Sequence, residues 1–180
     1  GYIGRLLTDE GTPAAGDEEY LRVNSGELTL TGVEYSGRRY LGLSPFSLGF
    51  QAAYAKGQQE DENEPSLDGV SGRRIPPLFG RTSLHYEAED SASRLEWAEL
   101  SLVFAADQDE LHPEDISDPR IDPDGTAGWA TLNLDVGGRF NEAFDWNFGL
   151  HNLLDERYRV HASGLDAPGF GLTFGLRGHF

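Results

Sequence analysis

Apolar and polar residues alternate along most of the chain, in segments about ten residues long. The clearest segment begins at Phe170 and continues to the last residue. Its apolar residues share one parity, namely Phe170, Leu172, Phe174, Leu176 and Phe180. The other parity carries Thr173, Arg177 and His179. A period of two predicts a β-strand with one apolar and one polar face.

The same alternation recurs upstream and predicts about eight strands. Further segments lie near residues 1–6, 27–40, 46–54, 78–88, 95–104, 130–140 and 144–150. In the second of these, Leu28 and Leu30 have one parity, whereas Val33 and Tyr35 have the other. Because Gly32 lies between the two pairs, we expect a bulge or a change of face there.

The connections between these segments also alternate, between short and long. Short links lie near residues 41–45, 89–93 and 141–143, and long links near 9–24, 58–77, 107–128 and 152–169. Short turns at one end of a sheet and long loops at the other are typical of an outer-membrane barrel. Aromatic residues beside the short turns fit an interfacial belt. The pattern predicts an all-β, transmembrane antiparallel meander.

Composition narrows the range of functions. The chain of 180 residues carries 14 Lys and Arg against 31 Asp and Glu, a formal net charge of −17. This balance argues against binding nucleic acid or an anionic membrane face. The absence of cysteine excludes thiolate metal sites. No run of about 18 apolar residues predicts a transmembrane helix, and no motif requires a cofactor.

The C-terminal third carries motifs that point to a family. Asn152-Leu153-Leu154-Asp155 is followed by Tyr158, then by a loop that closes on Pro168-Gly169, and then by the strand that ends at Phe180. Upstream, 74–80 resembles an earlier strand boundary. In combination, these motifs resemble the C-terminal part of the β-barrel of a TonB-dependent outer-membrane receptor.

The resemblance implies a role in transport. Residues 1–180 would form a single piece of a barrel of about 22 strands, with the plug domain absent from the chain. The receptor would take up a ferric siderophore, haem or a similar scarce nutrient. Its location would be the cell outer membrane. Its partners would be outer-membrane lipid, the TonB complex and the barrel assembly machinery, with Phe174, Leu176 and Phe180 as the assembly signal.

Several polar residues are candidates for binding. The pairs Arg73-Arg74 and Arg38-Arg39 would attract an anionic substrate or form ion pairs with nearby carboxylates. His112 and His161 fall in long loops, where a haem receptor could place an axial ligand. Oxygen ligands for Ca²⁺ are available at Asp118, Asp122 and Asp124. Their spacing does not match an EF-hand loop, so a solvated acidic loop is the simpler interpretation.

Other interpretations stay open at this stage. Ser83 and His85 share a strand face, but residues two apart on a strand are separated by about 7 Å, too far for a nucleophile and its base. We therefore expect no enzyme. A self-contained eight-stranded barrel with a structural or adhesion role is one alternative, and a soluble β-sandwich binding module is another. For a barrel fragment we expect an open, curved sheet.

Overall fold

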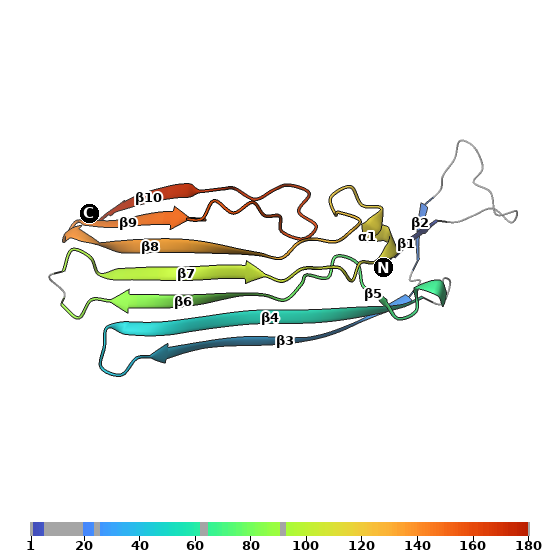
Figure 1. The fold of residues 1–180 in the computed structure, drawn as a ribbon, viewed down its shortest axis with the longest axis horizontal. Coiled ribbons are helices and arrows are strands. Elements are labelled where there is room, and N and C mark those ends of the chain that lie inside the picture. The colour runs from blue at the N-terminus through green and yellow to red at the C-terminus, as the bar shows by residue number, and fades with distance from the viewer. Residues whose placement is uncertain (1, 6–19, 24–25, 62–64, 91–92, 180) are drawn as a thin grey trace, which may run out of the picture.

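A computed structural model describes residues 2–5, 20–23, 26–61, 65–90 and 93–179 (Figure 1). Strands account for most of it. They are β1 (Tyr2–Arg5), β2 (Tyr20–Val23), β3 (Gly26–Tyr40), β4 (Phe46–Asp61), β5 (Val70–Ser71), β6 (Phe79–Glu87), β7 (Trp97–Ala105), β8 (Trp129–Asn141), β9 (Phe144–His151) and β10 (Gly171–Gly178). The helical turns are η1 (Pro65–Leu67) and α1 (Pro113–Ile116). Phe180, part of the predicted assembly signal, lies outside the described residues.

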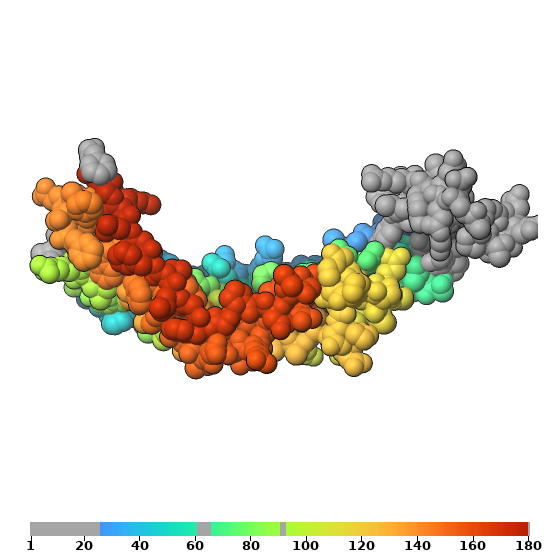
Figure 2. Space-filling model, turned by 90° about the horizontal axis from the view of Figure 1, so that it is seen from above, coloured from blue at the N-terminus to red at the C-terminus, as the bar shows by residue number. Residues whose placement is uncertain are grey.

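The main sheet is an antiparallel meander. Its strand order is β10-β9-β8-β7-β6-β4-β3, and β5 pairs with the end of β4 as the eighth strand. The predicted all-β meander is therefore confirmed. Within the described ranges β3 and β10 do not pair with each other, so the sheet is open rather than closed. Figure 2 shows that the sheet curves along its length, as expected for a piece of a barrel wall.

The N-terminal strand departs from the prediction. We expected residues 1–6 to form one more strand of the meander and residues 9–24 to form a long link. Instead, β1 pairs with β2 in a separate two-stranded sheet, with Tyr2 opposite Val23. Alternation within a segment indicates a strand, but it does not identify the partner, which is set by long-range pairing.

The register between strands aligns residues of one kind across the whole sheet. A leucine row crosses six strands, each member directly opposite the next: Leu48, Leu84, Leu100, Leu134, Leu150 and Leu172. One residue away, on the other face, lies a predominantly polar row: Ser47, His85, Glu99, Asp135, Gly149 and Thr173. Because a shift of one residue would exchange the two faces, this alignment fixes the register.

The apolar face has no second layer packed on it. Among the described residues, Ile121 is the single buried hydrophobic residue. Leu100 is 41% exposed and Leu172 63% exposed. A β-sandwich would bury these residues between two sheets, so the structure excludes the sandwich interpretation. A single layer with one apolar face instead matches the wall of a barrel that contacts lipid.

Of the two alternatives predicted at Gly32, the change of face is confirmed and the bulge is not. β3 pairs with β4 without interruption from Gly26 to Tyr40, and the register shift lies between Arg139 and Asn141 near the β8–β9 turn. The strand is regular and its apolar residues change sides. Val33 shares the outer face with Tyr54, whereas Leu30 lies on the inner face.

The two inner leucines, Leu28 and Leu30, are approached by a loop that folds toward them. A Cβ added at Gly57, opposite Leu30, would lie 2.8 Å from the Ile75 side chain, and one at Gly72 would lie 2.7 Å from Leu28. The loop between β5 and β6 therefore packs on the inner face of β3 and β4. The contact covers these leucines only in part, since Leu28 is 38% and Leu30 60% exposed.

Short and long connections are sorted as predicted. The β3–β4, β6–β7 and β8–β9 turns lie at one end of the sheet, and the long β4–β6, β7–β8 and β9–β10 connections lie at the other (Figure 1). Aromatic pairs lie near the short turns: Phe46 with Tyr86 at 5.4 Å between ring centroids, and Phe140 with Trp146 at 5.8 Å. Among the described residues, no helix is long and apolar enough to cross a membrane.

Candidate functional site

The long loops converge on an ion-pair cluster that contains both arginines of the predicted pair. Arg73 Nη1 lies 2.6 Å from Glu114 Oε2, and Arg73 Nε lies 3.5 Å from Asp115 Oδ1. The backbone N–H of Arg74 donates to Asp115 Oδ2 at 2.7 Å. The Asp115 side chain is 2% exposed, so these contacts compensate its burial. The two arginines thus connect the β5–β6 loop to α1.

Asp118 joins a third arginine to this cluster. Its Oδ2 lies 2.7 Å from Nη2 of both Arg74 and Arg120, and its Oδ1 accepts from Arg120 Nε at 2.9 Å. These hydrogen bonds, foremost those from Arg120, hold the pKa of the Asp118 carboxyl well below its usual 3.8. The cluster thus combines three guanidinium groups with the carboxylates of Glu114, Asp115 and Asp118, and its formal charges cancel.

His112 has a structural role in this cluster. It is the N-cap of α1, and its Nδ1 accepts the backbone N–H of Glu114 at 3.1 Å. The side chain is almost fully buried, and Nε2 has no hydrogen-bond partner among the described residues. Since Nδ1 accepts a hydrogen bond, Nε2 carries the ring proton of the neutral imidazole. In this arrangement neither nitrogen of His112 offers a free lone pair to an external iron.

His161 belongs to the same region through a different loop. Its Nδ1 lies 2.9 Å from Thr126 Oγ1, which links the β9–β10 loop to the β7–β8 loop. Burial lowers the pKa of His161 below its ordinary 6.5, and the nearby Asp115 carboxylate partly opposes this shift. The four residues predicted to bind substrate are therefore gathered at one end of the sheet by three loops. Their role in binding stays a prediction.

The three aspartates proposed as calcium ligands do not form a common site. Asp118 is occupied by Arg74 and Arg120, and Asp122 Oδ1 accepts the backbone N–H of Asp124 at 3.0 Å in a turn. In the part of the chain that the structure describes, no group of three or more His, Cys, Asp or Glu side chains is arranged to hold a metal ion. The acidic loop is instead organised by arginine.

The Asn-Leu-Leu-Asp motif fixes the β9–β10 loop. Asn152 has a positive φ of 51° and is 3% exposed. Its amide donates to the carbonyls of Glu156 and Pro168 and accepts from the Glu156 N–H, all within 3.3 Å. Asp155 Oδ1 accepts the N–H of Phe170 at 2.8 Å and so holds the start of β10. Sequence reasoning found this motif but did not recognise its mechanical role.

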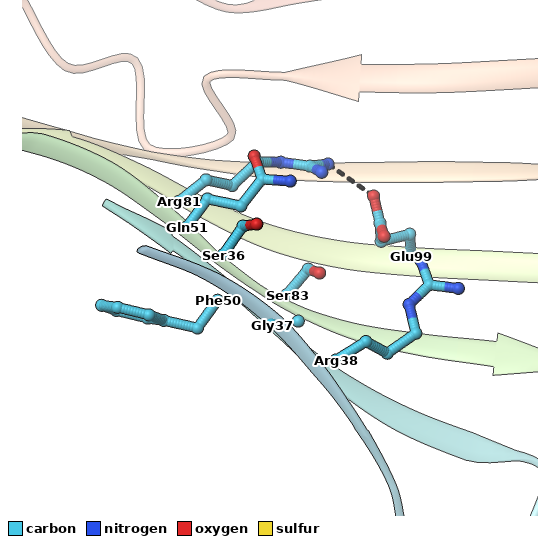
Figure 3. Close-up of a pocket in the computed structure, with 9 residues that line it drawn as sticks. Ser36, Gly37, Arg38, Phe50, Gln51, Arg81, Ser83 and Glu99 are labelled. Atoms are coloured by element: carbon cyan, nitrogen blue, oxygen red, sulfur yellow. Dashed lines mark hydrogen bonds and ion pairs between the residues drawn. The ribbon is translucent and has the colours of Figure 1, made fainter. Parts of the chain in front are cut away.

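A second polar region lies on the inner face of the sheet, away from the loops. It is a hollow of about 290 Å³ lined by residues of β3, β4, β6 and β7, among them Ser36, Arg38, Gln51, Arg81 and Glu99. Figure 3 shows these side chains on one side of the sheet, with Phe50 on the opposite side. We call this region the wall hollow. The sequence signal for it was the pair Arg38-Arg39.

An ion-paired network lies along one edge of the wall hollow. Arg81 Nη2 donates to Glu99 Oε1, and His85 Nδ1 lies 3.7 Å from Glu99 Oε2. Ser83 lies between Arg81 and His85 on β6, opposite Ser101. Ser83 and His85 make no hydrogen bond with each other among the described residues.

Comparison with known proteins identifies the family. A family model described as "TonB dependent receptor-like, beta-barrel" matches residues 2–153. The chain belongs to this family. Its proteins are outer-membrane transport receptors of Gram-negative bacteria, so the predicted location in the outer membrane is confirmed. No curated protein matches the chain.

Solved structures of the same architecture resemble this TonB-dependent receptor barrel. One is described as "Copper transporter OprC", with 22% identity, a TM-score of 0.69, and coverage of 85% of this chain and 23% of that one. Another is the ferric yersiniabactin uptake receptor FyuA from Yersinia pestis, with 14% identity, a TM-score of 0.58, and coverage of 87% and 24%. The chain thus spans about a quarter of these proteins and fits a C-terminal part of their barrel.

Proposed function

We propose that residues 1–180 form part of the C-terminal barrel wall of a receptor that imports a scarce nutrient, with energy supplied through TonB. The observation that supports this most strongly is the single-layered sheet with a continuous leucine row on one face and a polar row on the other. In a barrel, these faces would contact lipid and the lumen respectively. The plug and the TonB contact would belong to other parts of the parent protein.

A ferric siderophore is the substrate class that we favour over haem. His112 is committed to capping α1 and is buried, which leaves His161 as the available loop histidine. A copper substrate, as named for OprC, has less support from this part of the barrel. Soft copper ions favour thiolate and thioether ligands. The 180 residues of this chain include neither cysteine nor methionine.

We further propose that Arg73, Arg74 and His161 form part of the rim through which the substrate enters. Arg73 and Arg74 have side chains that are 34% and 40% exposed. Because their charges are already matched by Glu114, Asp115 and Asp118, they hold the loops in place more than they attract anions. The rim would then present a fixed surface to a chelate, while specificity would depend on loops from the rest of the barrel.

The experiment is iron uptake by cells that carry or lack the full receptor. Cells with the receptor are expected to accumulate a radiolabelled ferric siderophore from a panel, and to stop when the proton-motive force is dissipated. The receptor should fractionate with outer membranes and resist carbonate extraction. Recovery as a soluble protein, or uptake that is independent of membrane energy, would contradict the proposal.

A self-contained eight-stranded barrel has less support. Such a barrel must pair its first and last strands. In the described part of the chain, β3 and β10 do not pair with each other. Exposed strand edges in lipid leave backbone groups without partners. Further strands from the parent protein would satisfy both edges.

A further inference from the structure

The wall hollow contains polar side chains that have no partner in the described part of the chain. No hydrogen bond or ion pair involves the side chains of Ser36, Arg38 or Gln51 within those ranges. Arg38 remains a cation at any physiological pH and offers up to five N–H donors. The hydroxyl of Ser36 and the amide of Gln51 are further donors. All three residues are exposed, so water satisfies their donors, and an anion that replaces this water breaks no hydrogen bond within the described chain.

The shape of the hollow follows from glycine at the position opposite Arg38. Gly49 pairs with Arg38 on β3 and with Ser83 on β6. A Cβ at Gly49 would lie 2.7 Å from Ser83 Oγ, so a side chain at this position would displace the serine and fill the space. The absence of a side chain leaves room for an occupant between Arg38 and Arg81 (Figure 3).

The local charge favours an anion. The charged groups that face the hollow are Arg38, Arg81 and Glu99, with His85 beside Glu99. Glu99 accepts a hydrogen bond from Arg81 and lies near His85, so its negative charge is already compensated. Two further carboxylates of the same face, Glu34 and Asp135, lie outside the lining of the hollow. Among the charged side chains that line it, Arg38 is therefore the one without an opposite charge beside it.

We propose that the wall hollow binds a carboxylate-sized anionic group, with Arg38 as its main ligand and Gln51 and Ser36 as neutral donors. The planar guanidinium matches a carboxylate through two parallel hydrogen bonds. Within the proposed transport function, on which this inference rests, the hollow would hold an acidic group in the lumen. That group belongs either to a soluble substrate or to an acidic side chain elsewhere in the receptor.

The test compares Arg38→Gln with Arg39→Gln in the purified full-length receptor. Arg39 is the neighbouring residue of the same type, but it lies opposite Leu48 on the outer face, so it controls for the loss of one positive charge. The melting temperature is measured against citrate concentration at constant ionic strength, with erythritol as a neutral solute. A ligand that binds the folded state raises the melting temperature as its concentration rises.

For a soluble anion, citrate raises the melting temperature of the parent and of Arg39→Gln. In Arg38→Gln the citrate concentration needed for the same rise increases at least roughly ten-fold, because a charge-assisted hydrogen-bond pair is lost. For an internal carboxylate, Arg38→Gln melts at a lower temperature than Arg39→Gln without citrate. Identical behaviour of the two variants in both measurements would overturn the inference. Uptake measured in parallel shows separately whether the receptor transports iron.

Discussion

The assignment of the two sheet faces leads to a test at neighbouring alanines of β4. Ala52 and Ala53 lie near the middle of the strand and are both half-buried. Ala52 shares the outer face with Phe50, whereas Ala53 lies on the inner face directly opposite Glu34. Replacing each with arginine introduces the same group into the same strand, one residue apart, on opposite faces.

The two variants should differ strongly in stability. An arginine on the lipid face of a barrel costs about 2–4 kcal/mol near the bilayer midplane, which is a factor of roughly 30 to 1,000 in the unfolding equilibrium. At position 53 the guanidinium can reach the carboxylate of Glu34 across the strands, and such a pair contributes about 0.2–1 kcal/mol. We therefore expect the free energy of unfolding of Ala53→Arg to be close to that of the parent, and that of Ala52→Arg to be far lower.

The assay is urea unfolding of the full receptor in lipid vesicles, followed by tryptophan fluorescence and by the folded band on an unheated denaturing gel. Ala52→Arg is expected to lower the unfolding midpoint and the yield of folded band, whereas Ala53→Arg leaves both near the parental value. The reasoning is refuted if Ala53→Arg is destabilised as much as Ala52→Arg. It is equally refuted if arginine at position 52 has no effect, because that face would then not contact lipid.

The loop contacts give three further predictions, each measured by limited proteolysis of the folded receptor. Asn152→Ala should lower the free energy needed to open the β9–β10 loop by about 1–3 kcal/mol, because buried backbone groups lose their partners. Asn152→Gly should recover only the part of this loss that comes from the positive φ at position 152. Arg120 lowers the pKa of Asp118, so the ionised Asp118 carboxyl stabilises the folded loop fully above pH 3.8. This stabilisation is lost as the pH falls further. Pepsin cleavage of the parent near α1 should therefore rise as the pH falls. The Asp118→Asn variant should be cleaved readily at every pH in this range. Burial lowers the pKa of His161, so folding favours the neutral ring, and loop stability should fall as the pH drops below 6.5. His161→Gln should lack this dependence, and a flat parental profile between pH 7 and 5 would contradict it.

The sequence by itself determined the type of element and the two faces for the long strands of the main sheet. The parity of Phe46, Leu48 and Phe50 is visible in one segment because the side chains of a strand alternate with a period of two, which needs no partner. The sorting of short and long connections was also readable, and so was the family resemblance around Asn152 and Tyr158. The structure confirms these features for β3, β4 and β6 to β10, whereas β2 and β5 lie in segments that were predicted to be links.

Only the tertiary structure decided which distant residues meet. The leucine row depends on the register of six strands, and the pairing of Arg74 with Asp118 joins residues 44 positions apart. Neither could be read from one segment, because carboxylates suited to Arg74 are abundant in every long loop. The same limit applies at Gly32. The sequence showed that the apolar parity changes there, but it did not show that a distant loop, at Gly72 and Ile75, lies against Leu28 and Leu30.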